Sequence, residues 1–348
     1  MRPSPLSSWI QTTFKISLYG IVVGILLVLL VFDSKSPVNF VLSGIIGFSG
    51  CWMIASVERF LVPRIRQEAY WVEILLVSLA RIVTMAMTAV LVVFFYLLTQ
   101  GMPPTQAADR AVGSALVNPS MLPVHGVAFI ASLVATFFVA LSRKLGPGEL
   151  TQWLQGRYRH PREEQRVIMF VDLNDSTAIA HTLGDRLYSE FVQEFMAELT
   201  EPILKSGGQV SHYIGDEVVI TWPITPRRPR ADWPNFLNLA TQALRQSAPR
   251  YQSKFGRVPD FKVGVHAGSV IATEVGVLKS EIVFHGDALN VGARLAGLCR
   301  SLGASALVTQ QALDLASNLA QGSAESKGVQ EIRGRAAGVE AFAWRTAE

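Results

Sequence analysis

Cysteine is nearly absent from this chain, whose 348 residues contain only Cys51 and Cys299. Two cysteines so far apart provide neither a disulfide framework nor the spacing of a zinc site. Basic residues interleaved with aromatic ones are lacking as well. The densest basic stretch, residues 223–230, contains three prolines and no aromatic residue, so it predicts an exposed loop. We therefore expect no nucleic-acid partner.

Charged residues are scarce too, at 17% against 50% hydrophobic residues, and they are missing above all from the N-terminal part. Four nearly uncharged runs lie there: Leu18–Phe32, Val38–Ser56, Val72–Leu98 and Met121–Leu141. Each is close to the ~20 residues that a helix needs to cross a bilayer. We predict an all-α domain of four transmembrane helices in a lipid bilayer, with a buried soluble bundle as the alternative. Arg81 in the third run is expected to face the bundle, as a structural contact or as a sensor.

Basic residues flank the runs unevenly, and this predicts the orientation. They gather before the first run, between the second and third, and after the fourth, which places both ends of the domain in the cytoplasm. The expected location is the inner (plasma) membrane, multi-pass. The predicted domains are a membrane domain (1–142), a juxtamembrane linker (143–165) and a cytoplasmic catalytic domain (166–348). Within the linker, residues 149–159 are compatible with a short helix.

Two aspartates carry the strongest chemical signal in the remaining sequence. Asp172 follows the apolar run Val167–Val171, which predicts a buried strand. Asp216 lies with Gly215 between two β-rich runs, as expected for a hairpin turn. Neighbouring strands of one sheet would bring both carboxylates to one edge, where Mg²⁺ could bind with room for water and phosphate oxygens. Either aspartate alone is more often a turn residue or a helix N-cap.

A third element favours the metal interpretation. Residues 285–295 predict a turn followed by a helix, in which Asn290 and Arg294 share one face because they are four residues apart. Gly292 and Ala293 are small enough to let this helix lie close to a partner.

These pieces together resemble a known family. The stretches that match it are Phe170–Thr177, Tyr213–Val218, Gly264–Gly268 and Gly286–Leu295. Residues from about 160 to 345 resemble the catalytic domain of class III nucleotide cyclases, the adenylate and guanylate cyclase family. The four motifs occur in the family's order and near its spacing, whereas one alone would be weak evidence.

The resemblance implies a role for each matched residue. Asp172, Asp216 and the backbone carbonyl of Leu173 would hold two Mg²⁺ or Mn²⁺ ions per active site. Asn290 would orient the ribose, and Arg294 would stabilise charge on the α-phosphate. Near the C-terminus, Arg333 and Arg335 stand where the family has a basic turn that contacts the β- and γ-phosphates; usually a lysine does so.

Base recognition departs from the family pattern. Adenine-specific members commonly have a lysine four residues before the second metal aspartate, where this chain has His212. Their companion carboxylate or threonine usually stands seven residues before the ribose asparagine, where this chain has Val283. His212 could equally be a half-buried strand histidine bonded to a carbonyl. ATP is the expected substrate only because most bacterial members of the family make cyclic AMP, not because any residue of this chain indicates adenine.

The order of predicted elements suits an α+β ferredoxin-like sheet with helices on one face. In the family the aspartates and the Asn–Arg pair meet across a dimer interface, so we expect a homodimer with two equal sites. The expected function is membrane-bound conversion of ATP to 3′,5′-cyclic AMP and pyrophosphate for intracellular signalling. The alternatives are a cyclase of GTP or a pyrimidine triphosphate, a diguanylate cyclase or polymerase-palm enzyme, and a catalytically silent nucleotide-binding receptor.

Overall fold

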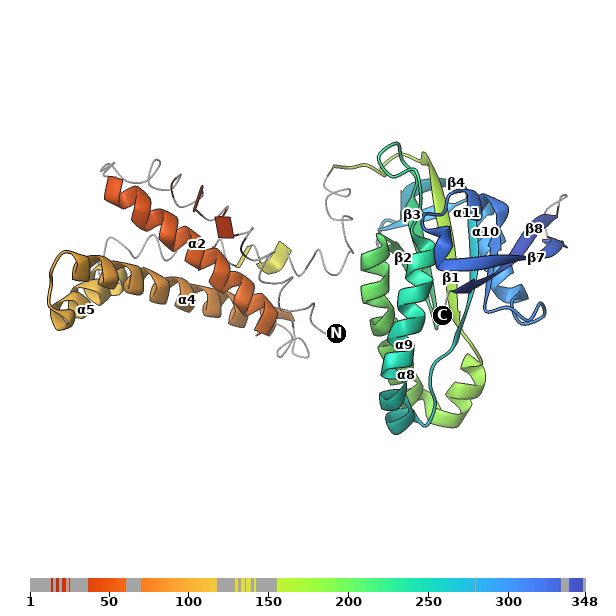
Figure 1. Cartoon of the computed structure of the whole chain (residues 1–348), viewed down its shortest axis with the longest axis horizontal. Helices are drawn as coiled ribbons and strands as arrows, with labels where there is room; N and C mark the ends of the chain where they lie inside the picture. The colour runs from red at the N-terminus through yellow and green to blue at the C-terminus, as the bar shows by residue number, and fades with distance from the viewer. Residues whose placement is uncertain are drawn as a thin grey trace. The chain divides into compact units, whose positions relative to one another are not determined.

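The computed structural model describes residues 37–60, 70–117, 155–278, 280–332 and 338–346, together with single residues and short stretches between 14 and 25 and between 129 and 141. The chain divides into two compact units, Arg2–Leu145 and Gly146–Glu348 (Figure 1). Most of the predicted first and fourth membrane runs lie outside the described residues, as do residues 143–154 of the linker. The described part of the linker begins with a turn at residues 155–158, where the sequence suggests the end of a short helix over residues 149–159.

The described N-terminal unit is helical. Its elements are α2 (Pro37–Phe60), α4 (Tyr70–Thr99), α5 (Pro104–Val112) and a π-helical turn η1 (Gly113–Val117). Helices α2 and α4 contain the second and third predicted runs. Among the described residues, one helical stretch, Ile74–Thr99, is long and apolar enough to cross a membrane, and only 6% of its most apolar part is buried.

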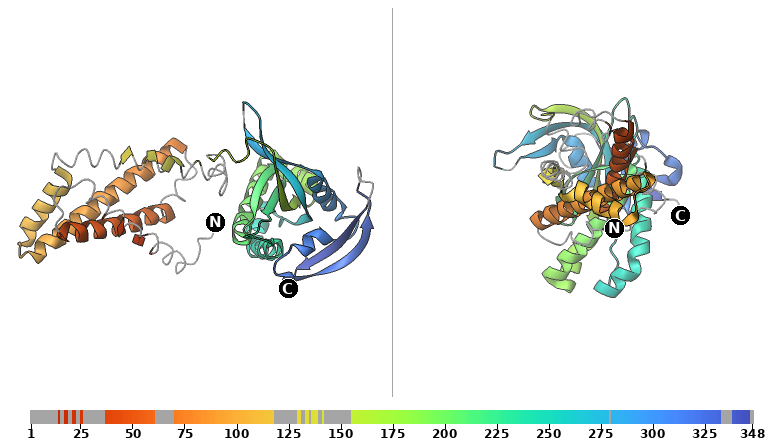
Figure 2. Two further views of the ribbon diagram at one scale, coloured as in Figure 1. Left: turned by 90° about the horizontal axis from the view of Figure 1, so that it is seen from above. Right: turned by 90° about the vertical axis from the view of Figure 1, so that its left-hand side faces the viewer.

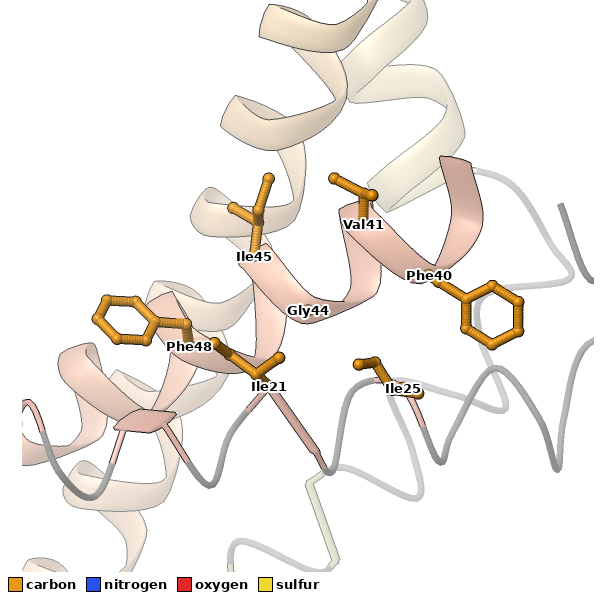
Figure 3. A pocket seen from close by; sticks show the side chains of 7 residues that line it. All are labelled: Ile21, Ile25, Phe40, Val41, Gly44, Ile45 and Phe48. Carbon is orange, nitrogen blue, oxygen red and sulfur yellow. The ribbon is translucent and has the colours of Figure 1, made fainter. Parts of the chain in front are cut away.

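Polar side chains are buried between α4 and the fourth predicted run. Arg81 is 8% exposed and donates from Nη1 to Oγ1 of Thr136 at 2.7 Å. The hydroxyl of Ser78 lies 3.3 Å from the same Thr136 oxygen. These contacts agree with the predicted structural role of Arg81. On another side of the unit, α2 and the segment containing Ile21 and Ile25 enclose an apolar crevice (Figure 3).

The C-terminal unit contains a mixed β-sheet. Its strands are β1 (Arg162–Leu173), β2 (Gln209–Ile214), β3 (Glu217–Pro223), β4 (Phe261–Val275), β5 (Glu281–His285), β6 (Ala306–Thr309), β7 (Gly322–Gln330) and β8 (Val339–Thr346). The described strands follow the order β2-β3-β1-β4-β6-β8-β7, and β5 pairs with β4. The helices are α8 (Ser176–Ser206), α9 (Trp233–Phe255), α10 (Asp287–Leu298) and α11 (Gln310–Asp314), with a 3₁₀ turn η3 (Leu319–Gln321).

The first six elements, β1-α8-β2-β3-α9-β4, form the ferredoxin-like arrangement that the sequence predicts, with β1 antiparallel to both neighbours. Helices α8 and α9 lie side by side (Figures 1 and 2). They pack on one face of the sheet against residues such as Val167, Met169 and Val171. The prediction of helices on one face only is wrong, because Ile168 and Phe170 point to the other face and pack against α10. Strand β1 is therefore buried on both faces, which explains its uninterrupted apolar run.

Close backbone contact between α10 and the sheet explains two of the motif glycines. A Cβ on Gly264 of β4 would lie 2.1 Å from the carbonyl oxygen of Gly292 and 2.4 Å from the nitrogen of Ala296, both in α10. A Cβ on Gly292 would lie 2.9 Å from the ring of Phe170. Only glycine permits this approach, so these positions set how deeply α10 lies on the sheet.

A buried arginine connects the start of β1 to the β4–β5 hairpin. Arg166 is 3% exposed, bonds through two nitrogens to Glu164 at 2.8 and 2.9 Å, and donates to Thr221 at 2.7 Å. Its guanidinium lies 4.3 Å from the ring centre of Phe284 in β5. Tyr158, just before β1, donates to the same Glu164. The end of the predicted linker is thus bonded to the start of β1.

Candidate active site

The ends of two neighbouring strands bring Asp172 and Asp216 together. Strand β1 pairs with β3 so that Asp172 lies opposite Glu217. Asp216 precedes Glu217 in the two-residue turn between β2 and β3, where Gly215 has a φ of 63° that favours glycine. The tight hairpin and the antiparallel register therefore place both carboxylates at one edge of the sheet.

The electrostatics of this edge show an excess of negative charge. Burial, and after it the nearby charges of Asp172 and Asp216, together raise the pKa of Glu217 to about 7, against the opposing effect of Lys262. The Oδ2 atom of Asp216 is buried and has no hydrogen-bond partner among the described residues. A buried carboxylate oxygen without a donor is costly unless a cation supplies the missing interaction.

These residues fit a divalent cation. The two aspartates offer hard oxygen ligands, and Leu173, whose carbonyl is the third predicted ligand, is the last residue of β1. The described residues contain no group of three or more His, Cys, Asp or Glu side chains arranged for a metal. Two carboxylates and one carbonyl would fill only part of the coordination shell of Mg²⁺, which keeps several waters or takes phosphate oxygens when it binds a nucleotide.

Asn290 and Arg294 lie on the outer face of α10. Both are exposed, whereas Val291 and Leu295 of the same helix are fully buried against the sheet. The predicted ribose and phosphate residues therefore point away from the core of their own protomer. This orientation makes them available to a second molecule.

The two predicted base residues lie on strands that are not paired with each other. His212 is in β2, and Val283 is in β5, paired with Thr273 of β4. Strands β3, β1 and β4 lie between them in the sheet. Burial lowers the pKa of His212, with Glu281 acting in the opposite direction, and its Nδ1 lies 2.8 Å from the hydroxyl of Ser211. The described contacts do not place His212 and Val283 together.

A small cleft between these strands has a different lining. It contains Gln209 and Val210 of β2 and Ile282 and Phe284 of β5, with Arg166, Tyr158 and Thr221. Residues on either side of Val283 thus face β2, because side chains alternate along β5. Arg333 and Arg335 lie outside the described residues.

Sequence reasoning missed three residues beside the aspartates. Lys262 of β4 bonds to Asp172, and Glu217 lies opposite Asp172. Tyr188 of α8 has its pKa raised by burial first and then by Asp216 and Asp172, so its hydroxyl lies near both. Lys262 and Tyr188 come close only through strand pairing and helix packing, whereas Glu217 adjoins Asp216 in the sequence and meets Asp172 through the β1–β3 register.

Known proteins show what this arrangement is similar to. The chain is 34% identical over 199 residues to a Rhizobium meliloti protein named adenylate cyclase 2, covering 57% of this chain and 55% of that protein. It is 24% identical over 148 residues to an Anabaena cylindrica adenylate cyclase, covering 41% of this chain and 29% of that protein. The chain thus spans about half the length of the first of these relatives, and less of the other. No protein-family profile matches it.

The solved structure of a bacterial light-regulated adenylyl cyclase has the same fold. It superposes with a TM-score of 0.51 at 18% identity, covering 65% of this chain and 64% of that one. The C-terminal unit thus has the fold of a class III nucleotide cyclase domain. In this domain Asp172 lies at the end of β1 and Asp216 in the β2–β3 turn. Asn290 and Arg294 lie on α10. Cyclases of this class generally use Mg²⁺ or Mn²⁺.

Proposed function

We propose that the chain is an adenylate cyclase that converts ATP to 3′,5′-cyclic AMP and pyrophosphate. The observation that carries this proposal is the pair of Asp172 and Asp216 at one sheet edge, where the buried Oδ2 of Asp216 has no donor among the residues that the structure describes. The names of the curated relatives support the choice of ATP.

The proposed roles follow from where the side chains lie. Asp172, Asp216 and the carbonyl of Leu173 would hold two Mg²⁺ or Mn²⁺ ions, which when bound lower the pKa of the ribose 3′-hydroxyl and neutralise phosphate charge. The 3′-hydroxyl gives up its proton to water, its oxygen forms a bond to the α-phosphorus as the bond from that phosphorus to the bridging oxygen breaks, and pyrophosphate leaves. Asn290 orients the ribose, and the guanidinium of Arg294 stabilises the charge on the α-phosphate.

The proposal includes a symmetric homodimer. Asn290 and Arg294 are exposed on the face of α10 that points away from the core of their own domain. A second copy of the chain, related by a two-fold axis, would present its aspartates to them and receive the same in return. Arg333 and Arg335 are proposed to contact the β- and γ-phosphates.

The base readout is the least family-like part of the proposed site. His212 and Val283 offer neither the lysine nor the carboxylate that reads adenine, so apolar shape would discriminate between bases. We therefore expect only a modest preference for ATP, and GTP is the second candidate substrate on this ground. A preference above roughly a thousandfold would show that other residues read the base.

A turnover assay tests the function directly. The full chain is incubated with Mg²⁺ or Mn²⁺ and with ATP, GTP, CTP or UTP in turn, and the cyclic product is identified by mass, with Asp172→Asn as the matched control. Cyclic AMP formed by the wild type and not by the variant supports the proposal. Nucleotide binding without any cyclic product would instead indicate a silent receptor.

We also propose that the N-terminal unit is a four-span domain of the inner (plasma) membrane that holds the cyclase domain in the cytoplasm. Helix α4 supports this, because a stripe of large apolar side chains along it is 46–61% exposed: Leu75, Leu79, Val83, Met87, Leu91 and Phe95. Such a stripe is stable in lipid and unfavourable in water. Retention of the chain in carbonate-washed membranes, with the cyclase domain cleaved by protease only in inside-out vesicles, is the expected result.

A further inference from the structure

Lys262 lies beside the proposed metal site although none of the four cyclase motifs contains it. The register of the sheet puts Asp172 of β1 opposite Lys262 of β4 on one side and opposite Glu217 of β3 on the other. Directly opposed residues on antiparallel strands have neighbouring side chains. Strand pairing therefore places the Asp172 carboxylate between a lysine and a glutamate.

The contact between Lys262 and Asp172 is short and partly shielded. The Nζ of Lys262 lies 2.6 Å from Oδ2 of Asp172, and the two side chains are 22% and 26% exposed. Fully exposed ion pairs contribute little because water and salt screen them. A charge-assisted hydrogen bond with this degree of burial is stronger and holds the carboxylate in one orientation.

The charges around this pair are unequal. Asp172, Asp216 and Glu217 supply three carboxyl groups, and the ammonium group of Lys262 contacts the first of them. Lys262 also acts on Glu217, whose pKa it lowers against the effects of burial and of both aspartates. Its positive charge thus acts on Glu217 as well as on Asp172.

We infer that Lys262 is the resident counter-ion of the metal site: it holds the Asp172 carboxylate while no divalent cation is bound, and it competes with the cation for that carboxylate. The inference rests on the proposed function, which makes Asp172 a metal ligand. An ammonium and a dication repel one another at such distances, so the cation must displace Lys262 or bind more weakly beside it.

The competition has two measurable consequences. Without nucleotide, replacing Lys262 by a neutral residue should raise the affinity for Mn²⁺ roughly tenfold or more, because a nearby repulsive charge is removed. Without metal, the protein in which Lys262 is neutralised should unfold at a lower temperature than the wild type, because its carboxylates lose the ammonium group. Mn²⁺ should then raise the unfolding temperature of this variant by more than it raises that of the wild type.

The experiment compares four full-length proteins: wild type, Lys262→Met, Lys262→Arg and Lys205→Met. Methionine keeps an unbranched apolar stem and removes the charge, whereas arginine keeps the charge. Lys205 is a suitable control because it bonds to Glu201 in a surface pair on α8, at 2.8 Å. Mn²⁺ binding is measured by calorimetric titration without nucleotide, and thermal unfolding is followed with and without Mn²⁺.

The inference predicts tighter Mn²⁺ binding for Lys262→Met alone, with Lys262→Arg and Lys205→Met near the wild type. Unchanged or weaker binding in a folded Lys262→Met protein overturns it. If this variant does not fold without metal, recovery of folding in Mn²⁺ supports the inference and failure to recover overturns it. If the wild type binds no Mn²⁺, both the proposed metal site and the role of Lys262 are refuted. If the wild type and Lys262→Met bind Mn²⁺ with the same affinity, only the role of Lys262 is refuted.

Discussion

Substituting Gly264 by alanine tests how the fold positions the catalytic helix. The new Cβ would lie 2.1 Å from the carbonyl oxygen of Gly292 and 2.4 Å from the nitrogen of Ala296. Both contacts are with backbone atoms, so no side chain can rotate away. Helix α10 would have to shift outward by about 1 Å to restore ordinary van der Waals distances.

The magnitude follows from the effects of overpacking and of displacement. Forcing an extra methyl group into a packed core typically costs about 1–3 kcal/mol. For a domain of this size that lowers the melting temperature by roughly 2–12 °C. A displacement of about 1 Å at a reacting centre costs up to about a hundredfold in rate. Because α10 carries Asn290 and Arg294, we expect kcat to fall by at least tenfold.

The assay combines thermal unfolding with cyclic nucleotide formation in the full chain. Gly297→Ala, on the same helix, is the matched control, because a Cβ there meets no atom within 4 Å. That substitution should leave kcat unchanged and stabilise the helix by up to about 1 kcal/mol. A Gly264→Ala protein with the melting temperature and kcat of the wild type would show that the close approach does not position α10.

Further expectations concern the charges and the assembly. Asp172→Asn and Asp216→Asn should each reduce cyclisation below a tenth of the wild-type rate while the protein stays folded, as judged by circular dichroism. Asp172→Asn and Arg294→Ala, each inactive alone, should recover activity when mixed, and heterodimers that stay inactive would place the whole site in one protomer. Burial would raise the pKa of Glu164, but hydrogen bonds from Arg166 and Tyr158 and the charges of the nearby arginines have a larger effect and lower this pKa below the ordinary 4.5. This stabilisation is present above the pKa of the unfolded state and is lost as pH falls through the pKa of the folded state. The difference in melting temperature between the wild type and Glu164→Gln should therefore be largest near pH 7 and smaller in acid. A fragment beginning at Gly148 should be soluble and show activity that rises more than linearly with its concentration, as measured by dilution.

The sequence alone predicted the order of strands and helices in the cyclase domain, because each element has its own local signal. The apolar run before Asp172 indicated β1, and Gly215 indicated the β2–β3 turn. The ferredoxin-like sheet was then predicted from the order of these elements along the chain. Asp172 and Asp216 could be placed together on this basis, since only one hairpin and one strand pair separate them.

Only the tertiary structure decided what surrounds the aspartates. Lys262 lies far from Asp172 in sequence, and its contact depends on the β1–β4 register, which a one-residue slip would abolish. The packing of α10 on the second face of the sheet likewise depends on Gly264 meeting Gly292 across strand and helix. Periodicity within one segment reports which side chains share a face, but the partner of that face is set by contacts between segments distant along the chain. The cleft between β2 and β5 likewise depends on the tertiary structure, because these two strands are not paired with each other in the sheet.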